Sequence, residues 1–437
     1  MKNDILHVYC VDMTVDGYGV AKVDGLVIFV KGLIIEEEAM VKIIAHKKNL
    51  AYAIIDRLIK ESRHRVMSSC KIAYKCGGCD LRHISYEFQL ELKRKWLKTT
   101  LNNIAGIDLE VPEIIASPSI DGYRNKVQVP VALHKVGFYR SNSHDIVEYD
   151  KCDVQSQRAN DVIAYIKDII IKEGQDRDFR HIIIKEAFAT GEMMVAFVLH
   201  KEHFNGLETL VSMIVNRFPF ITSVIVNVND KDTNVILGDK DIIMYGSSYI
   251  IDKLGDLDFK ISLHSFYQIN PKQAIAIYDE ILKEATITKD TKVLDLYSGI
   301  GTIALYLARS AKEVVGVEVV KKAVEDAKDN ALDNGIENAR FYFDDAKGDM
   351  QKYIAGKDLV VVDPPRKGLN TGLIKTLIDE GTDEIAYVSC NPATLARDLA
   401  LFLEGGYKIK SLRGFDMFPH TTHIETVCIL QKDEKNR

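Results

Sequence analysis

KVLDLYSGIG, residues 292–301, decides the fold of the C-terminal part of this 437-residue chain. An apolar run of strand character ends there in a turn that carries Gly299 and Gly301, and a helical pattern follows. A turn of this kind lets a ligand approach the backbone at the N-terminus of a helix. Further apolar runs alternate with helical patterns, which predicts a doubly wound α/β sheet with helices on both faces. These runs are EVVGVEV (313–319), ARFYF (339–343), DLVVVDPP (358–365), EIAYVSC (384–390), YKIKSLRGFD (407–416) and HIETVCILQ (423–431).

Carboxylates stand at the ends of two of these runs. Glu318 follows Gly299 by about twenty positions, where a carboxylate can accept hydrogen bonds from both hydroxyls of a ribose. Asp345 ends the next run, where it can meet the edge of an adenine. The full GxGxxG pattern is absent from the sequence, so this spacing fits either a dinucleotide or S-adenosylmethionine.

Two other runs end in groups that can react. Cys390 is followed at once by Asn391-Pro392, and a thiol that a strand delivers to a loop is a candidate nucleophile. Asp363 lies in the loop after the preceding run, where an open α/β sheet binds its ligands. A lone cysteine is most often a small buried hydrophobic residue. These neighbours nevertheless favour a cofactor-dependent enzyme.

The N-terminal part of the chain follows a different pattern. Residues 5–60 form short apolar runs broken by glycines, which predicts a small antiparallel barrel. Barrels of this kind bind single-stranded RNA or serve a structural role. A basic helix is expected over 86–101, and 181–200 are expected to form a hairpin with Thr190-Gly191 at its turn. The middle of the chain therefore predicts an α+β domain.

Composition limits the function further. The formal net charge of −6 argues against a general nucleic-acid binder, but residues 60–98 hold ten Lys or Arg and four Asp or Glu. This local charge indicates a basic surface, or equally a solvated helix face. The longest apolar stretch, 193–199, is far shorter than the roughly 18 residues that cross a bilayer. Three of the seven cysteines lie within ten positions, which favours the reducing cytoplasm and a metal site.

Four motifs occur in order along the chain: FYQINPKQ (266–273), DPPRKGL (363–369), SCNPATLARDL (389–399) and HIETV (423–427). With them the chain resembles the S-adenosylmethionine-dependent RNA uracil-5-methyltransferases over nearly its whole length. DGYGVAKVDGLVIFVKG (16–32) resembles the TRAM RNA-binding barrel. The resemblance implies a multi-domain fold: an OB-like TRAM barrel over 1–60, a central RNA-binding α+β domain with the cysteine segment over 61–260, and a Rossmann-like catalytic domain over 261–437.

The resemblance also implies roles for single residues. Cys390 is expected to add to C6 of uracil, because C5 is too electron-poor to attack a sulfonium methyl group without activation. Glu425 is expected to remove the C5 proton, and its burial in a strand should raise its pKa toward the working range. Arg366 fits either the target nucleotide or a structural ion pair. Residues expected to contact the cofactor are Gln268, Tyr297, Glu318, Asp345 and Asp363.

The cysteines divide into three groups. C-x5-C-x2-C resembles the iron-sulfur ligands of the family, and Cys152 in YDKCDVQ is expected to be the fourth ligand. Four thiolates can hold zinc or a [4Fe-4S] cluster, and the resemblance favours the cluster. Cys10 and Cys428 are expected in the core. The first three ligands are Cys70, Cys76 and Cys79.

The cysteine segment resembles the enzymes of bacterial 23S ribosomal RNA more than those of transfer RNA. We therefore expect a cytoplasmic methyltransferase that forms 5-methyluridine in 23S ribosomal RNA, with the uracil splayed out of its stack. One alternative is an enzyme acting on the T-loop of transfer RNA. Another, from a different class, is a ribosome-assembly factor that binds RNA without catalysis. No protein partner and no membrane association are expected.

Overall fold

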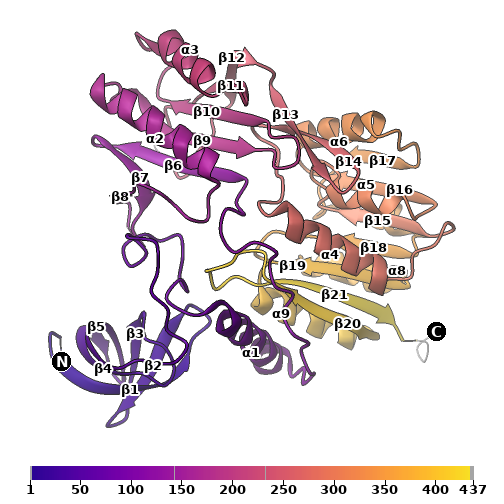
Figure 1. Ribbon diagram of the computed structural model, residues 1–437. Helices are drawn as coiled ribbons and strands as arrows, with labels where there is room; N and C mark the ends of the chain where they lie inside the picture. The colour runs from indigo at the N-terminus through magenta and orange to yellow at the C-terminus, as the bar shows by residue number, and fades with distance from the viewer. Residues whose placement is uncertain (1, 142, 232, 434–437) are drawn as a thin grey trace.

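The computed structural model describes residues 2–141, 143–231 and 233–433. A small barrel, a central sheet and a larger C-terminal sheet follow one another along the chain (Figure 1). The barrel is set apart and joins the other two through residues 61–85 (Figure 1). These are the three fold classes that the sequence predicts, in the predicted order. Within the described ranges, no helix is long and apolar enough to cross a membrane.

The barrel forms because alternate residues of its strands are apolar and point inward, among them Ile28, Val30 and Val41. Neighbouring strands are antiparallel except β3 and β5, which run parallel. The sequence predicted an antiparallel barrel, but a closed ring with an odd number of strands needs one parallel pair. The strands, in the order β1-β2-β3-β5-β4, are β1 (Ile5–Met13), β2 (Tyr18–Val23), β3 (Leu26–Lys31), β4 (Glu38–Lys47) and β5 (Leu50–Lys60).

The central sheet has seven strands in the order β12-β11-β10-β9-β6-β7-β8. Helices α2 (Gln157–Lys172) and α3 (Leu207–Arg217) cover one face of this sheet. The opposite face packs on a hairpin, β13 (Tyr249–Leu254) and β14 (Leu257–Ser262), and through it joins the core of the C-terminal sheet. The strands are β6 (Lys126–Ala132), β7 (Lys135–Tyr139), β8 (Ile146–Glu148), β9 (Phe179–Glu186), β10 (Met193–Leu199), β11 (Ile221–Val228) and β12 (Lys240–Gly246), with a 3₁₀ turn at Asp176–Asp178.

The predicted hairpin of the central domain is confirmed. β9 and β10 pair antiparallel from Glu186 opposite Met193 onward. Gly191 at the turn has φ +81°, a left-handed conformation that glycine adopts without steric cost. β11 then lies parallel to β10, because α3 forms the crossover between them.

The C-terminal sheet has the predicted doubly wound order, β17-β16-β15-β18-β19-β21-β20. The first five strands in this order are parallel, and β21 runs antiparallel between β19 and β20. The strands are β15 (Lys292–Leu296), β16 (Glu313–Glu318), β17 (Ala339–Phe343), β18 (Leu359–Val362), β19 (Glu384–Ser389), β20 (Tyr407–Phe415) and β21 (Glu425–Lys432).

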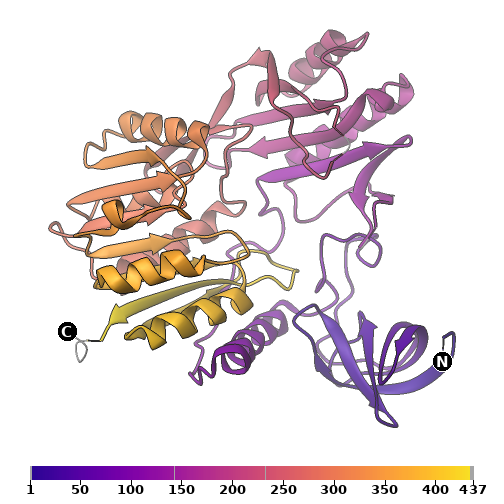
Figure 2. The same cartoon turned by 180° about the vertical axis from the view of Figure 1, so that it is seen from behind.

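Helices cover both faces of this sheet, as Figures 1 and 2 show from opposite sides. Val293 and Val361 face one layer, whereas Leu294 and Val362 face the other, as the alternation of side chains along a strand requires. One layer holds α4 (Pro271–Glu284), α5 (Thr302–Ala308) and α6 (Lys321–Asp333). The other holds α7 (Gln351–Ile354), α8 (Thr371–Glu380) and α9 (Pro392–Glu404).

The basic helix α1 (Tyr86–Ala105) lies on the second layer, beside α9 (Figure 1). It extends beyond the predicted end and stops at Gly106, whose φ of +63° caps it. Trp96 and Leu97 are buried in the same cluster as Leu395. The amine of Lys93 lies 2.6 Å from Asp416, and both side chains are fully buried. Helix α1 therefore packs as part of the C-terminal core, while the boundaries predicted at residues 60 and 260 stay predictions.

Candidate active site

The sheet register brings Cys390 and Glu425 together. Strand β19 pairs antiparallel with β21, and Ser389 lies opposite Thr426. Cys390 directly follows Ser389 and Glu425 directly precedes Thr426, so both residues lie at the end of this ladder. Directly opposed residues of an antiparallel pair have Cα atoms about 4.5–5.5 Å apart. The ladder therefore positions a thiol and a carboxyl side by side, although they are distant in sequence.

Asp363 joins them from the neighbouring strand. It follows β18 directly, and β18 is parallel to β19 with Val362 opposite Tyr387. The carboxyl ends of parallel strands meet at one edge of a sheet, which is where such sheets bind ligands. We call Asp363, Cys390 and Glu425 the catalytic edge. Glu425 is buried, whereas Cys390 and Asp363 are partly exposed and accessible to a ligand.

Burial and like charge shift the protonation of all three groups. Desolvation raises the pKa of Glu425 well above its usual range, and the charge of Asp363 raises it further. Desolvation raises the pKa of Asp363 to about 7. Burial, together with the charges of Glu425 and Asp363, raises the pKa of the Cys390 thiol to about 11. The two carboxyl groups titrate together, so the pair retains a proton near neutral pH.

Arg366 and His423 border this edge. A nitrogen of Arg366 lies 3.3 Å from Nδ1 of His423, and the positive charge of Arg366 opposes the upward shift of the Cys390 pKa. Burial, followed by the charges of Arg366, Lys93 and Arg124, lowers the pKa of His423 to about 4. His423 is therefore neutral near pH 7, and its Nδ1 accepts a hydrogen bond from Arg366. The sequence did not predict His423 as a site residue, although it lies within the HIETV motif.

The predicted nucleoside-binding residues lie at the same edge of the sheet, beyond β15, β16 and β17. The backbone N–H groups of Gly299 and Val320 donate to the two oxygens of Glu318, over 3.0 and 2.8 Å. Each carboxylate oxygen keeps a second lone pair, so Glu318 can still accept hydrogen bonds from a ribose. A side chain at Gly299 would enter open space, so the backbone there is open to a ligand.

Tyr297 shows the backbone strain typical of a functional loop. Its φ is +67°, which is rare for a residue with a bulky side chain. Burial and the charge of Asp345 raise the pKa of Tyr297 to about 12, so the phenol is a hydrogen-bond donor at neutral pH. Asp345 is exposed, and its Oδ1 accepts from the N–H of Lys347 over 3.0 Å.

The sequence does not predict Asp295 as a site residue. It is 1% exposed in the middle of β15, and its Oδ1 has no hydrogen-bond partner among the described residues. Desolvation, and then the charge of Asp363, raises the pKa of Asp295 well above its usual range. The hydroxyl of Ser298 is likewise buried without a described partner. Unpaired buried polar atoms need a partner, and a bound cofactor can supply one.

Gln268 lies where the central sheet meets the catalytic domain. The side chain of Asn125 donates to the carbonyl of Gln268 over 2.9 Å, and the Asn125 N–H donates to the carbonyl of Ile269 over 3.0 Å. The chain before β6 therefore fixes the FYQIN segment. Gln268 itself is partly exposed.

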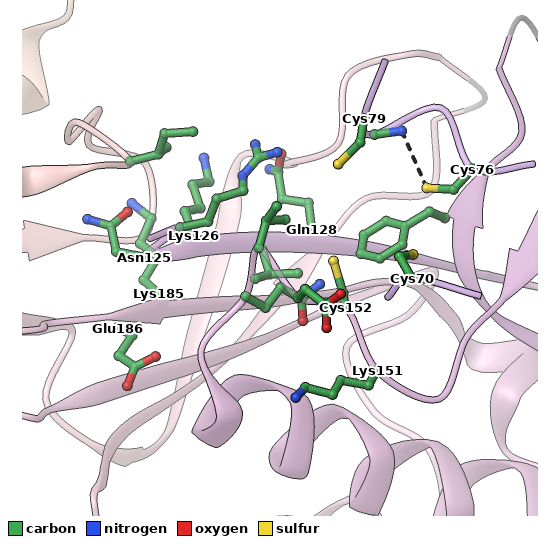
Figure 3. A pocket seen from close by; sticks show the side chains of 18 of the residues that line it. Cys70, Cys76, Cys79, Asn125, Lys126, Gln128, Lys151, Cys152, Lys185 and Glu186 are labelled. Carbon is green, nitrogen blue, oxygen red and sulfur yellow. Dashed lines mark hydrogen bonds between the residues drawn. The ribbon is translucent and has the colours of Figure 1, made fainter. Parts of the chain in front are cut away.

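The four predicted metal ligands line one side of a cavity of about 340 Å³ (Figure 3). Burial raises the pKa of the Cys79 thiol to about 12 and that of Cys152 to about 11, and each pKa is raised further by neighbouring cysteines. The Gly78 N–H donates to the sulfur of Cys76 over 3.3 Å. The structure thus brings Cys70, Cys76, Cys79 and Cys152 to one place.

Their spacing bears on the choice of metal. Within the described residues, no three Cys, His, Asp or Glu side chains are close enough to hold one metal ion. A zinc site holds its four sulfurs about 2.3 Å from the ion and hence about 3.8 Å apart. A [4Fe-4S] cluster takes one thiolate on each of four irons and needs a wider ring of ligands. The four cysteines that line this cavity are soft donors, and this donor set suits either zinc or a [4Fe-4S] cluster.

Known proteins match this chain over nearly its whole length. The family model described as tRNA (Uracil-5-)-methyltransferase matches residues 85–433. An RNA methyltransferase of Bacillus cereus (strain ATCC 10987 / NRS 248) is 42% identical over 450 aligned positions, covering 99% of this chain and 98% of the relative. One from Halalkalibacterium halodurans is 40% identical, covering 98% and 97%.

A solved structure agrees with these matches. It is the tRNA (uracil-54, C5)-methyltransferase of Pyrococcus abyssi in complex with S-adenosyl-L-homocysteine. Its TM-score to this chain is 0.80 and its sequence identity is 30%, with 97% of this chain and 100% of that chain covered. The similarity therefore includes the barrel, the central sheet and the catalytic sheet.

Proposed function

This chain belongs to the tRNA (uracil-5-)-methyltransferase family, and from that premise we propose that it methylates C5 of a uridine in 23S ribosomal RNA through a covalent bond between Cys390 and C6. That it is an S-adenosylmethionine-dependent RNA (uracil-5-)-methyltransferase follows from its family. The observation that carries the proposed mechanism is the meeting of Cys390, Glu425 and Asp363 at the end of one β ladder.

The first step is nucleophilic. The partly exposed thiol of Cys390 loses its proton to solvent, the resulting thiolate forms a bond to C6 of the uracil, and the electron pair of the C5–C6 double bond moves into an enolate. When bound, S-adenosylmethionine would supply the methyl group as part of a positively charged sulfonium. The raised pKa of Cys390 means that the thiol is protonated in the resting protein, which protects it from oxidation.

The last step is a proton transfer. Glu425, as a carboxylate, accepts the C5 proton; the electron pair re-forms the C5–C6 double bond and the bond between Cys390 and C6 breaks. A carboxyl group with a raised pKa is a stronger base than one in water, so the burial of Glu425 suits this task. Asp363 keeps that pKa high through its charge.

The remaining predicted residues hold the cofactor in this proposal. Glu318 and Asp345 bind its nucleoside end, Tyr297 shields it, and Gln268 contacts the methionine part. Asp295 and Ser298, whose buried polar atoms lack partners among the described residues, complete that set. Tyr297, Glu318 and Asp345 lie at the same edge of the sheet, at the ends of β15, β16 and β17.

The cysteines are proposed to hold a [4Fe-4S] cluster with a structural role, because no step above moves an electron. Their approach to one cavity and their four thiol side chains support this proposal. Visible absorption and iron analysis of anaerobically purified protein test this. A colourless protein with stoichiometric zinc contradicts it.

Ribosomal RNA is the first candidate substrate because the cysteine segment resembles that of the enzymes of 23S ribosomal RNA. A ribosomal RNA target would place the activity in the cytoplasm. Transfer RNA is the second candidate, because the matched structure and the family model are described as transfer-RNA enzymes.

One assay separates the candidates. Ribosomal RNA and transfer RNA from a strain lacking this gene are incubated with the protein and labelled S-adenosylmethionine. We expect methyl transfer to 23S RNA and none with Cys390→Ala. Label in transfer RNA alone assigns the second candidate. Equal labelling by wild type and Cys390→Ala leaves only the RNA-binding role.

A further inference from the structure

Two lysines lie directly opposite each other at the end of the cavity away from the cysteines. β6 and β9 are antiparallel, and Lys126 is paired with Lys185. Their neighbours Val127 and Ile184 pack under α2, so both lysines point to the opposite face, into the cavity. Figure 3 shows Lys126 and Lys185 together on one side and the four cysteines on the other. Like charges directly opposite each other destabilise a sheet.

Carboxylates that line the cavity do not offset this charge. Asp153 accepts from Ser69 over 2.7 Å and from Arg82 over 3.2 Å. Glu186 accepts from Ser156 and lies 3.5 Å from Arg158. Both acids are therefore engaged with partners other than the two lysines.

The two amines differ in what they contact. The Lys185 amine donates to the carbonyls of Ser262 and Ser265, over 2.7 and 2.8 Å, and so is held in place. Burial, and then the charge of Lys126, lowers the pKa of Lys185 well below its usual range, and the charge of Asp326 opposes this shift. In the described part of the chain, the Lys126 amine has no hydrogen bond and no ion pair. Burial and the neighbouring charge of Arg124 lower the pKa of Lys126, so this amine lacks the anion that would offset its burial.

The surroundings indicate which anion fits. Phe266 lines the same cavity and is 65% exposed, which offers a face on which a base can stack. The FYQIN segment is fixed to this strand by Asn125, so the lysines lie beside the proposed methionine and substrate positions. Basic side chains that contact the backbone, together with aromatic rings on which bases stack, are typical of single-stranded nucleic-acid sites.

We propose that Lys126 and Lys185 bind a phosphodiester group of the RNA strand at this end of the cavity. The site is separate from the cysteines and from the catalytic edge, and it rests on the proposed function in that the ligand is RNA. Lys185 provides a fixed donor and Lys126 provides the partly exposed charge that meets the phosphate. In the absence of RNA, the pair destabilises the fold by its own repulsion.

The test uses Lys126→Gln in the full-length, anaerobically purified protein. Binding of a fluorescein-labelled oligouridine is measured by anisotropy over a range of salt concentrations. We expect about tenfold weaker binding, because a charged hydrogen bond is lost. The slope of log K against log salt should fall by about 0.7, the value for one phosphate contact on a single strand. The melting temperature without RNA should rise, because the opposed charge is gone.

Two variants control the experiment. Lys126→Arg keeps the charge and should keep the salt slope. Lys135→Gln removes an exposed lysine of the adjoining strand β7 and should change neither slope nor melting temperature. Lys185 is left intact because its loss would release the turn at Ser262 and Ser265.

Three results overturn the proposal. An unchanged salt slope in Lys126→Gln shows that no phosphate is bound there. A lower melting temperature shows that Lys126 has a structural role. Loss of bound iron with unchanged RNA binding shows that the charge serves the cysteine site. Oligouridine binding needs neither methyl transfer nor a ribosomal target. The binding measurement therefore tests the phosphate site even if the proposed function fails.

Discussion

The catalytic edge and the cysteine cavity both gather residues that are far apart in sequence, but they are held together in different ways. Cys390 and Glu425 continue a β ladder whose hydrogen bonds set their positions. Cys70, Cys76 and Cys79 lie in turns, and an isolated bridge between Cys76 and Arg140 is the local pairing there. The hydrogen bonds of a β ladder fix which residues lie opposite each other at its ends. The position of a turn instead depends on the side chains that contact it.

The side chains that hold the cysteine segment are charged. Arg82, only 6% exposed, donates to Asp121 and also to Asp153, next to Cys152. The N–H groups of Asp80 and Leu81, just after Cys79, both donate to the carbonyl of His420 over 2.9 Å. We therefore expect that substitutions at the catalytic edge can abolish catalysis without unfolding the protein. Substitutions around the cysteine cavity should instead lower the stability of the fold as well.

The largest effect is expected for Cys390→Ala. Removing the nucleophile should reduce methyl transfer by more than about 10⁴-fold. Because Cys390 lies at the end of a ladder and is partly exposed, the urea midpoint should stay that of wild type. Transfer of labelled methyl groups and urea denaturation measure the two quantities. A large loss of stability would show that the edge is not preformed.

Glu425→Gln should stop the reaction one step later. The addition and the methyl transfer do not require Glu425, because the thiol proton is lost to solvent, whereas the elimination needs this base to remove the C5 proton, so a covalent complex of protein and RNA should accumulate. We expect turnover to fall by about 10²–10⁴-fold. A denaturing gel with labelled RNA detects the complex, and the double variant Cys390→Ala, Glu425→Gln should not form it. Fast turnover without a complex would assign the base to another residue.

Arg82→Met tests whether the charged contacts around the cysteine cavity stabilise the fold. Breaking a buried ion pair costs about 3–5 kcal/mol, and because Asp121 is half exposed we expect about 2–3 kcal/mol here. Iron content should fall as well, since the cysteine segment loses its link to Asp153. Lys95→Met is the matched control: its pair with Asp12 is half exposed and should contribute less than about 1 kcal/mol. An equal loss in the free energy of unfolding for both variants would show that the contacts of Arg82 stabilise the fold no more than an exposed ion pair does.

The sequence could predict the residues that strands carry. Cys390, Asp363 and Glu318 each end an apolar run, and the order of those runs implied the sheet that brings them to one edge. The doubly wound fold, the barrel and the hairpin at Gly191 could be predicted for the same reason: periodicity reports which face is buried. The motif resemblance added Glu425 and Gln268, which no spacing indicates.

The rest depends on tertiary contacts that leave no periodic signal. Asp295 sits inside an apolar strand and looks like any strand residue until its unpaired oxygen is seen. The packing of α1 on α9 and the buried pair of Lys93 with Asp416 join segments more than 300 residues apart. The opposition of Lys126 and Lys185 also requires the register of two strands that the sequence does not pair.

The smallest expected effect is a shift in the pH dependence of the rate, which depends on the two carboxyl groups of the catalytic edge. Glu425 must be ionised to accept the C5 proton, and the pKa of its partner Asp363 is raised to about 7. The rate at saturating RNA should therefore rise with pH, by up to about tenfold per pH unit, over the range in which the carboxyl pair loses its protons. In Asp363→Asn the like charge beside Glu425 is gone, so the pKa of Glu425 falls and the rise should move to lower pH.

His423→Asn is the control for this profile. Because the pKa of His423 is lowered to about 4, its titration lies below the rise, and the variant should keep the wild-type midpoint. A rate that continues to rise toward pH 11 would instead assign the profile to the thiol of Cys390, whose pKa is raised to about 11. In that case thiolate formation limits the rate, and the carboxyl pair is not the group that sets it.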